Sequence, residues 1–182
     1  MESYRAVGDE PGALIPLSNL GYGAALKGDL TRARQLLRRG LDDALRINHR
    51  SMAAHIAINL GHVLALAGEI AAARICYGNV LGVLGLPDAE RENLMIGASY
   101  MLAQSQRSQA SAQLLGALAQ RAAQTQPGAE IEDAMSRAVQ QMLVAALPAD
   151  TFAESMQLGN RMTIGEIDAL LMAELVESAS TL

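Results

Sequence analysis

Apolar and small residues recur along this chain at the three- and four-residue spacing of helices, and the whole pattern returns forty residues later. Residues 19–41 read NLGYGAALKGDLTRARQLLRRGL, and residues 59–81 read NLGHVLALAGEIAAARICYGNVL. A repeat of this size at a fixed period is typical of stacked helical units, each of which buries its apolar face against its neighbour. The pattern therefore favours a protein with an extended binding surface over one built around an active site.

Each copy predicts two helices joined by a short turn. The pairs at 28–29 and 68–69 are a glycine followed by an acidic residue. Glycine readily adopts the left-handed conformation that ends a helix, and an acidic side chain is favoured at the start of the next one. Ala33 and Ala73 supply the small residues that a close helix crossing needs. A weaker third copy lies at 97–119, where the aligned turn falls at Gln106 instead of a glycine.

The region beyond the repeats predicts helices of a different kind. Proline and glycine punctuation divides it into three segments, at roughly 130–147, 149–159 and 164–178. Thr163 and Glu166 have the spacing of a capping box for the last of them. We therefore expect residues 1–129 to form the repeats and residues 130–182 to form acidic capping helices of the same domain.

The composition agrees with an all-α fold, since the chain is 51% hydrophobic and only 3% aromatic, without tryptophan. The uncharged stretch 51–68 approaches the length of a membrane span. Because it contains two histidines and matches the repeat, we interpret it as a buried helix and expect no membrane association. The single cysteine, Cys76, argues against a disulfide framework and fits a reducing cytoplasm.

Charge is distributed unevenly along the chain. The total is −5, and acidic residues gather after residue 127. Arginines decorate what the pattern predicts as one long helix, at Arg32, Arg34, Arg38, Arg39, Arg46 and Arg50. An acidic protein is a poor sequence-independent ligand of DNA, so we interpret this helix as a solvated outer face and expect no direct contact with nucleic acid.

The motifs NLG–GDL–A–R and NLG–GEI–A–R resemble tetratricopeptide repeats with lengthened helices. The later part of the chain is similar to the C-terminal end of bacterial transcription regulators of the LuxR and AfsR types, which join a signalling ATPase, tetratricopeptide-like repeats and a DNA-binding domain. This similarity is carried by AQLLGALAQR at 112–121, by Pro127, and by the segment 149–175, where Phe152, Gly159, Met162, Thr163 and Glu166 match the family passage. The third repeat lacks its Gly-Asp turn, and Ile167-Asp168 replaces the usual Glu-Ala.

The resemblance implies an all-α, right-handed solenoid of helix-turn-helix repeats with a C-terminal helical cap. In tetratricopeptide proteins the first helix of each repeat lines a concave groove, which assigns one set of side chains to a recognition surface. This set is Tyr22, His55, Ile58, His62, Leu66, Asn93, Ile96 and Tyr100. The alternative is that these rings only fill the inside of a tight superhelix. The partner implied is a protein, a peptide or a small-molecule inducer.

The sequence indicates no catalytic, metal or cofactor site. His55 and His62 are seven residues apart, too far for a zinc pair on one helix, and no carboxylate lies near them on that helix. Cys76 and His62 lack a third, orienting group. We therefore expect an interaction or sensing module of a transcription regulator. An oligomerisation scaffold is the alternative, and a small enzyme is the third choice.

The start of the chain predicts association. Residues 3–12 resemble the tail of a preceding repeat, and they contain few large apolar side chains. We therefore expect the face with Leu14, Leu17 and Leu20 to stay open. An open apolar face on a globular chain tends to find a partner, most often in a two-fold dimer. The expectation is a homodimer joined through the first repeat.

Overall fold

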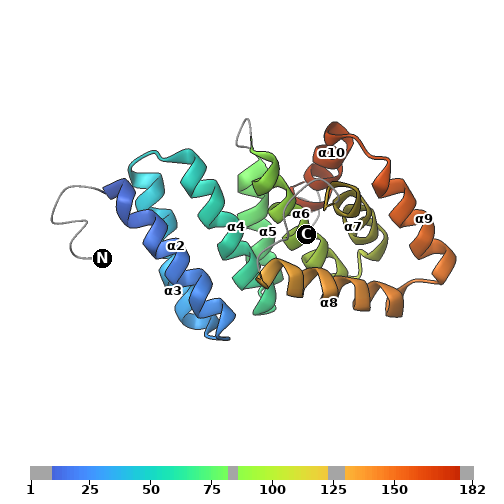
Figure 1. The fold of residues 1–182 in the computed structure, drawn as a ribbon, viewed down its shortest axis with the longest axis horizontal. Helices are drawn as coiled ribbons and strands as arrows, with labels where there is room; N and C mark the ends of the chain where they lie inside the picture. The colour runs from blue at the N-terminus through green and yellow to red at the C-terminus, as the bar shows by residue number, and fades with distance from the viewer. Residues whose placement is uncertain (1–9, 82–85, 123–129, 177–182) are drawn as a thin grey trace.

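The computed structural model describes residues 10–81, 86–122 and 130–176, and Figure 1 shows their helices. This part of the chain is 87% helical and contains no strand, so the all-α expectation is confirmed. The helices are α2 (Glu10–Leu26), α3 (Leu30–Arg46), α4 (Arg50–Leu66), α5 (Ile70–Leu81), α6 (Asp88–Gln104), α7 (Ser108–Ala122), α8 (Glu130–Ala146), α9 (Ala149–Asn160) and α10 (Ile164–Leu175). The expected tail at residues 3–12 lies mostly outside the described residues, and its last three residues belong to α2.

The turns within the helix pairs fall where the sequence predicts them. Gly28 and Gly68 have φ values of +78° and +76°, and Gln106 adopts the same left-handed conformation with φ +62°. The next amide closes each turn on a carbonyl five residues back, as from Asp29 N to Ala24 O at 3.0 Å. A left-handed residue followed by this hydrogen bond is the Schellman motif, which ends a helix. The third repeat, although weak in sequence, therefore turns like the others.

A further turn of the same kind separates α3 from α4. Asn48 has φ +57°, and asparagine is the residue that most often replaces glycine in this conformation. His49 then caps α4, because its Nδ1 accepts from Met52 N at 3.4 Å. The expectation of one long helix through Arg50 is wrong: α3 ends at Arg46, and Arg50 begins α4. The left-handed residues 28, 48 and 68 are evenly spaced, so the turn between the first two helix pairs resembles the turns within them.

The core lies between consecutive helices, which pack side by side from α2 to α5 (Figure 1). Helix α4 is buried on nearly all sides, which explains why it carries no charged residue after Arg50. The glycines of the NLG motifs lie at close crossings, where a Cβ on Gly21 would be 2.6 Å from Leu37 Cγ and one on Gly61 would be 2.8 Å from Tyr77 Cδ1. No helix among the described residues is long and apolar enough to cross a membrane.

The C-terminal helices enclose the third repeat. Helix α9 packs along α7 at a crossing of two glycines, where a Cβ on Gly116 would meet the carbonyl of Met156 and one on Gly159 would meet that of Gln113. Helix α10 lies against α5, and α8 lies against α6 and reaches α2 (Figure 1). Helix α8 therefore covers part of the side that α2 and α6 present.

The apolar face expected on the first repeat is largely closed. Leu14 and Leu17 are each only 1% exposed, because α2 packs on both α3 and α4. Leu20 alone of the three is exposed, at 49%. The predicted homodimer was based on an open leucine face, and most of that face is buried. The homodimer itself remains a prediction.

Candidate binding groove

The predicted recognition residues lie on the first helices of the three repeats, α2, α4 and α6, which we call the groove face. Ile58 and His62 are buried, and the other predicted residues are partly buried, namely Tyr22, His55, Leu66, Asn93, Ile96 and Tyr100. The structure brings several of them together, but not as an open row. Helix α8 lies across part of the groove face, and an open stretch remains beside it.

Tyr22 anchors the beginning of α8. Its hydroxyl donates to Glu132 Oε2 at 2.8 Å and accepts from the Ile131 backbone N–H at 3.0 Å. Burial raises the pKa of Tyr22 above its ordinary value, and the Ile131 bond offsets only part of this effect. The hydroxyl therefore keeps its proton near neutral pH and remains a donor for the carboxylate.

His62 lies on the other side of the same carboxylate. Its Nε2 is 3.0 Å from the Asn93 carbonyl oxygen, and its Nδ1 is 3.8 Å from Glu132 Oε1. His62 is 1% exposed, and burial lowers its pKa against the opposing effects of Glu132 and of the Asn93 bond. A neutral ring that donates from Nε2 leaves Nδ1 as an acceptor, and no described residue provides a hydrogen-bond partner for Nδ1.

Tyr77 completes this buried cluster from α5. Its ring centroid is 5.9 Å from that of His62, and its hydroxyl is buried without a hydrogen-bond partner in the described part of the chain. Gly97 admits both rings, because a Cβ there would lie 2.6 Å from His62 Cδ2 and would also meet the Tyr77 hydroxyl. Burial raises the pKa of Tyr77 well above its ordinary value, so the hydroxyl stays protonated.

Tyr100 lies farther along the groove face and is also covered. It packs against a small cluster of Ala112 from α7 and Val139 and Leu143 from α8. The sequence analysis did not predict that α8 covers these residues, although the sequence of α8 contains one indication. Glu132 begins the stripe of apolar residues that α8 buries, a position where a carboxylate is unexpected unless it has a partner.

The uncovered stretch forms a cavity of about 190 Å³ between α2, α4 and α6. Its lining combines two apolar side chains with polar ones: Ile15, Ser18, Asn19, Ser51, Met52, His55 and Glu90. Beneath it, Asn59 Nδ2 lies 3.3 Å from both Ser18 Oγ and His55 Nε2. The amide stands between the hydroxyl and the imidazole, so this arrangement suits hydrogen bonding to a ligand rather than activation of the serine.

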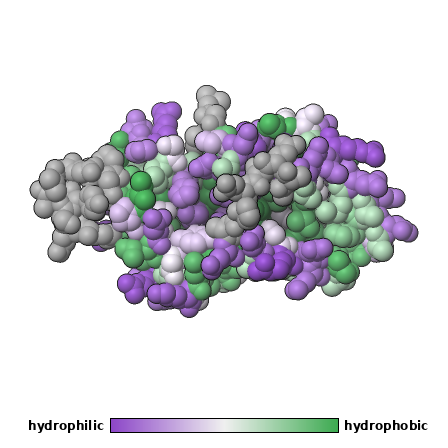
Figure 2. Space-filling model, viewed as in Figure 1, coloured by the Kyte–Doolittle hydropathy of each residue, from purple (hydrophilic) through white to green (hydrophobic). Residues whose placement is uncertain are grey.

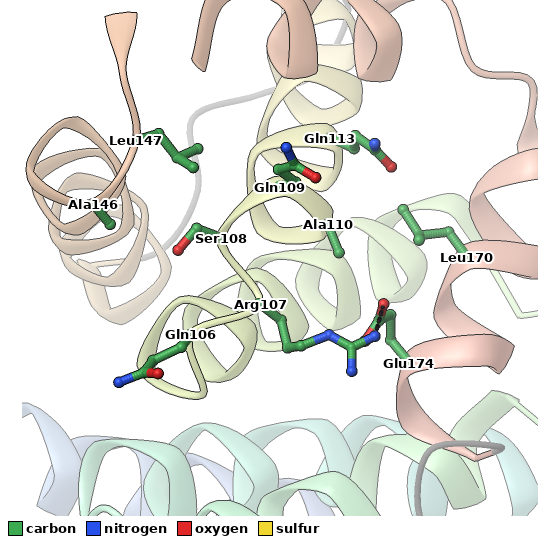
Figure 3. Close-up of a pocket in the computed structure, with 10 residues that line it drawn as sticks. All are labelled: Gln106, Arg107, Ser108, Gln109, Ala110, Gln113, Ala146, Leu147, Leu170 and Glu174. Carbon is green, nitrogen blue, oxygen red and sulfur yellow. Dashed lines mark hydrogen bonds and ion pairs between the residues drawn. The ribbon is translucent and has the colours of Figure 1, made fainter. Parts of the chain in front are cut away.

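A larger cavity of about 780 Å³ surrounds the turn between α6 and α7 (Figure 3). Gln109 and Gln113 of α7 line it, with the ends of α8 and α10 on either side. Among the described residues that line it, Arg107 is the only cation, and Glu174 neutralises it through an ion pair of 2.8 Å. The sequence did not predict this cavity, because its walls come from helices far apart along the chain.

The surface and the remaining polar groups add no further site. The face in Figure 2 mixes hydrophilic and apolar side chains. Exposed apolar side chains include Val144 of α8 and Leu158 of α9. Among residues 10–81, 86–122 and 130–176, no three histidine, cysteine or acidic side chains lie close enough to hold a metal ion. Burial raises the pKa of Cys76, which keeps the thiol protonated.

Comparison of the chain with protein-family models, with curated proteins and with solved structures finds no match.

Proposed function

We propose that this chain is a helical-repeat interaction module of a bacterial transcription regulator, acts in the cytoplasm, and performs no chemistry of its own. In this proposal the first three helix pairs form a right-handed solenoid like that of tetratricopeptide repeats. The evenly placed left-handed residues and the small residues at the helix crossings support it. The ligand is a helical segment of a partner protein, bound on the groove face.

One observation carries the proposal: a helix of the chain itself, α8, already lies on the groove face. The face therefore has the width and the apolar character that a bound helix needs, which is a recurring mode of peptide recognition. The cavity beside α8 is still open, and Ile15 and Met52 offer apolar contact there while His55 and Glu90 offer polar contact. A partner segment can anchor one side chain in this cavity.

A small-molecule inducer is the second candidate ligand. The cavity around the α6–α7 turn has the volume of pockets that hold small ligands. Apart from the Arg107–Glu174 pair, its lining is uncharged and divides evenly between polar and apolar side chains. A polar, neutral compound would fit it better than a charged one.

The test compares two exposed isoleucines on opposite sides of the helix pairs. Ile15 lines the open cavity and is 53% exposed, whereas Ile75 on α5 is 64% exposed. A photoreactive amino acid at Met52 in the full chain would first identify a partner in cells. The affinity of this partner for the purified wild-type, Ile15→Glu and Ile75→Glu chains would then be measured by calorimetry.

We expect Ile15→Glu to weaken binding by about ten-fold or more, because it places a charge in an apolar contact. Ile75→Glu should change the affinity by less than about two-fold. Equal affinity of the two variants would place the binding surface elsewhere and would contradict the proposal.

A further inference from the structure

We propose that the groove face recognises a carboxylate carried on an amphipathic helix, and that α8 is an exchangeable internal occupant of this site. The inference rests on the proposed function and specifies its partner: an acidic amphipathic helix that competes with α8. It follows from how Glu132 is held, from the pattern of buried residues along α8, and from the polar atom that the docked helix leaves unsatisfied.

The carboxylate site is built from two different repeats. Glu132 is only 3% exposed, and it lies between the Tyr22 hydroxyl of α2 and the His62 ring of α4. A buried carboxylate is costly unless a donor receives it, and Tyr22 is a donor that keeps its proton. The Ile131 N–H bonds to the same hydroxyl, so Tyr22 also fixes where the helix begins. The Tyr22 hydroxyl donates a stronger bond to a carboxylate at this position than to the carbonyl of a neutral amide.

The rest of α8 defines the pattern that a competing helix must match. Three apolar side chains that α8 buries follow the carboxylate at three, seven and eleven residues, which places all four positions on one helical face. The positions are Glu132, Met135, Val139 and Leu143. Most side chains on the other faces of α8 are exposed. A partner therefore presents one glutamate or aspartate at the start of an apolar stripe.

The fit of α8 is incomplete, which makes exchange possible. The buried polar atom that faces Glu132, His62 Nδ1, has no hydrogen-bond partner within the described residues. The nearest Glu132 oxygen is 3.8 Å from His62 Nδ1, too far for a hydrogen bond. Unsatisfied buried groups oppose docking, so the covalent attachment of α8 contributes to its occupancy by raising its local concentration.

The experiment uses a fluorescent peptide of residues 130–146 as the probe, added to the full chain and followed by anisotropy. Glu132→Gln in the chain weakens the docking of its own α8 on the groove face. The wild-type peptide should therefore bind this variant about five-fold or more tighter than it binds the wild-type chain. Glu130→Gln is the matched control, because Glu130 is an exposed carboxylate of the same helical turn. It should change binding by less than about two-fold.

A second arm tests the carboxylate itself. A peptide with Gln in place of Glu132 should bind the Glu132→Gln chain about five-fold or more weakly than the wild-type peptide does. Adding Tyr22→Phe to the chain should reduce this difference to less than about two-fold, because the donor is gone while the ring remains. Should the Glu132→Gln chain fail to fold, the same comparison of peptides is made on the wild-type and Tyr22→Phe chains.

Hydrogen exchange shows whether the peptide replaces α8. Binding should increase deuterium uptake in α8 of the chain while α9 stays protected. Unchanged uptake in α8, equal binding of both peptides, or no binding by any chain at about 100 µM peptide would each overturn the inference. The proposed function has a separate test: it survives such a result if Ile15→Glu still weakens the natural partner, and it falls if that variant has no effect.

Discussion

Gly61→Ala tests most directly how the repeats are held together. Gly61 lies where α4 crosses α5, and a Cβ there would be 2.8 Å from Tyr77 Cδ1 and 2.8 Å from Cζ, with Cε1 closer still. The Tyr77 ring is fully buried and also contacts His62. At these distances something must shift, so the two helices must separate or the ring must leave its position.

The expected loss of stability follows from two opposing effects. Overpacking a core contact of this kind costs about 1–3 kcal/mol, and a rigid, fully enclosed ring puts Gly61→Ala near the upper value. Replacing glycine by alanine inside a helix returns about 1 kcal/mol. The net destabilisation is therefore about 2 kcal/mol, which lowers the melting temperature of a chain of this size by about 4–8 °C.

Gly23→Ala is the matched control for the same exchange. Gly23 lies inside α2, and a Cβ there would have no atom within 4 Å. Only the gain in helix propensity remains, so this variant should be more stable than wild type by about 0.5–1 kcal/mol. Urea unfolding followed by circular dichroism gives both values, with the slope m showing whether the unfolding transition stays comparable.

Two results would refute the reasoning. One is a Gly61→Ala chain as stable as Gly23→Ala, which would mean that α4 and α5 do not cross closely. The other concerns Tyr77→Leu, which removes the ring. In that background the cost of Gly61→Ala should fall by about 1 kcal/mol or more, and additive effects of the two changes would show that the ring is not the obstacle.

Other predictions concern the acid–base cluster and the C-terminal helices. Because burial lowers the pKa of His62, the unfolded chain takes up a proton near pH 6.5 that the folded chain does not, so the stability present above that pH is lost on acidification. Between pH 7 and 5 the free energy of unfolding should fall by up to about 1.4 kcal/mol per pH unit through this group. The same dependence of the free energy of unfolding on pH in His62→Gln would contradict this prediction. Gly159→Ala should cost about 2–3 kcal/mol in urea melts, since the new Cβ meets the Gln113 carbonyl and backbone cannot move aside, and a neutral effect would exclude the tight α7–α9 crossing. Thr163→Ala should cost about 1 kcal/mol, because Thr163 Oγ1 accepts from Glu166 N and the reciprocal bond from Thr163 N to Glu166 completes a capping box; an unchanged melting curve would argue against the cap.

The local structure of this chain could be read from its sequence because local chemistry decides it. Gly28 and Gly68 end helices since the left-handed conformation costs glycine little, and the alignment placed the third turn at Gln106 without any glycine there. Thr163 and Glu166 form the capping box that their spacing predicts. Asn48 carries a similar signal, because asparagine tolerates the left-handed conformation, but the arginines on either side of it suggested one continuous charged helix.

The tertiary structure alone decided what covers the groove face. The sequence placed Tyr22 and His62 on the first helices of successive repeats, yet nothing local indicated that Glu132 would lie between them. That contact joins residues more than a hundred positions apart on α2 and α8, and it depends on the path of the chain after the third repeat. The burial of Leu14 and Leu17 was decided in the same way, because α2 meets α3 and α4 together. Periodicity determines which side of a helix is apolar, whereas the packing of distant helices determines what that side touches.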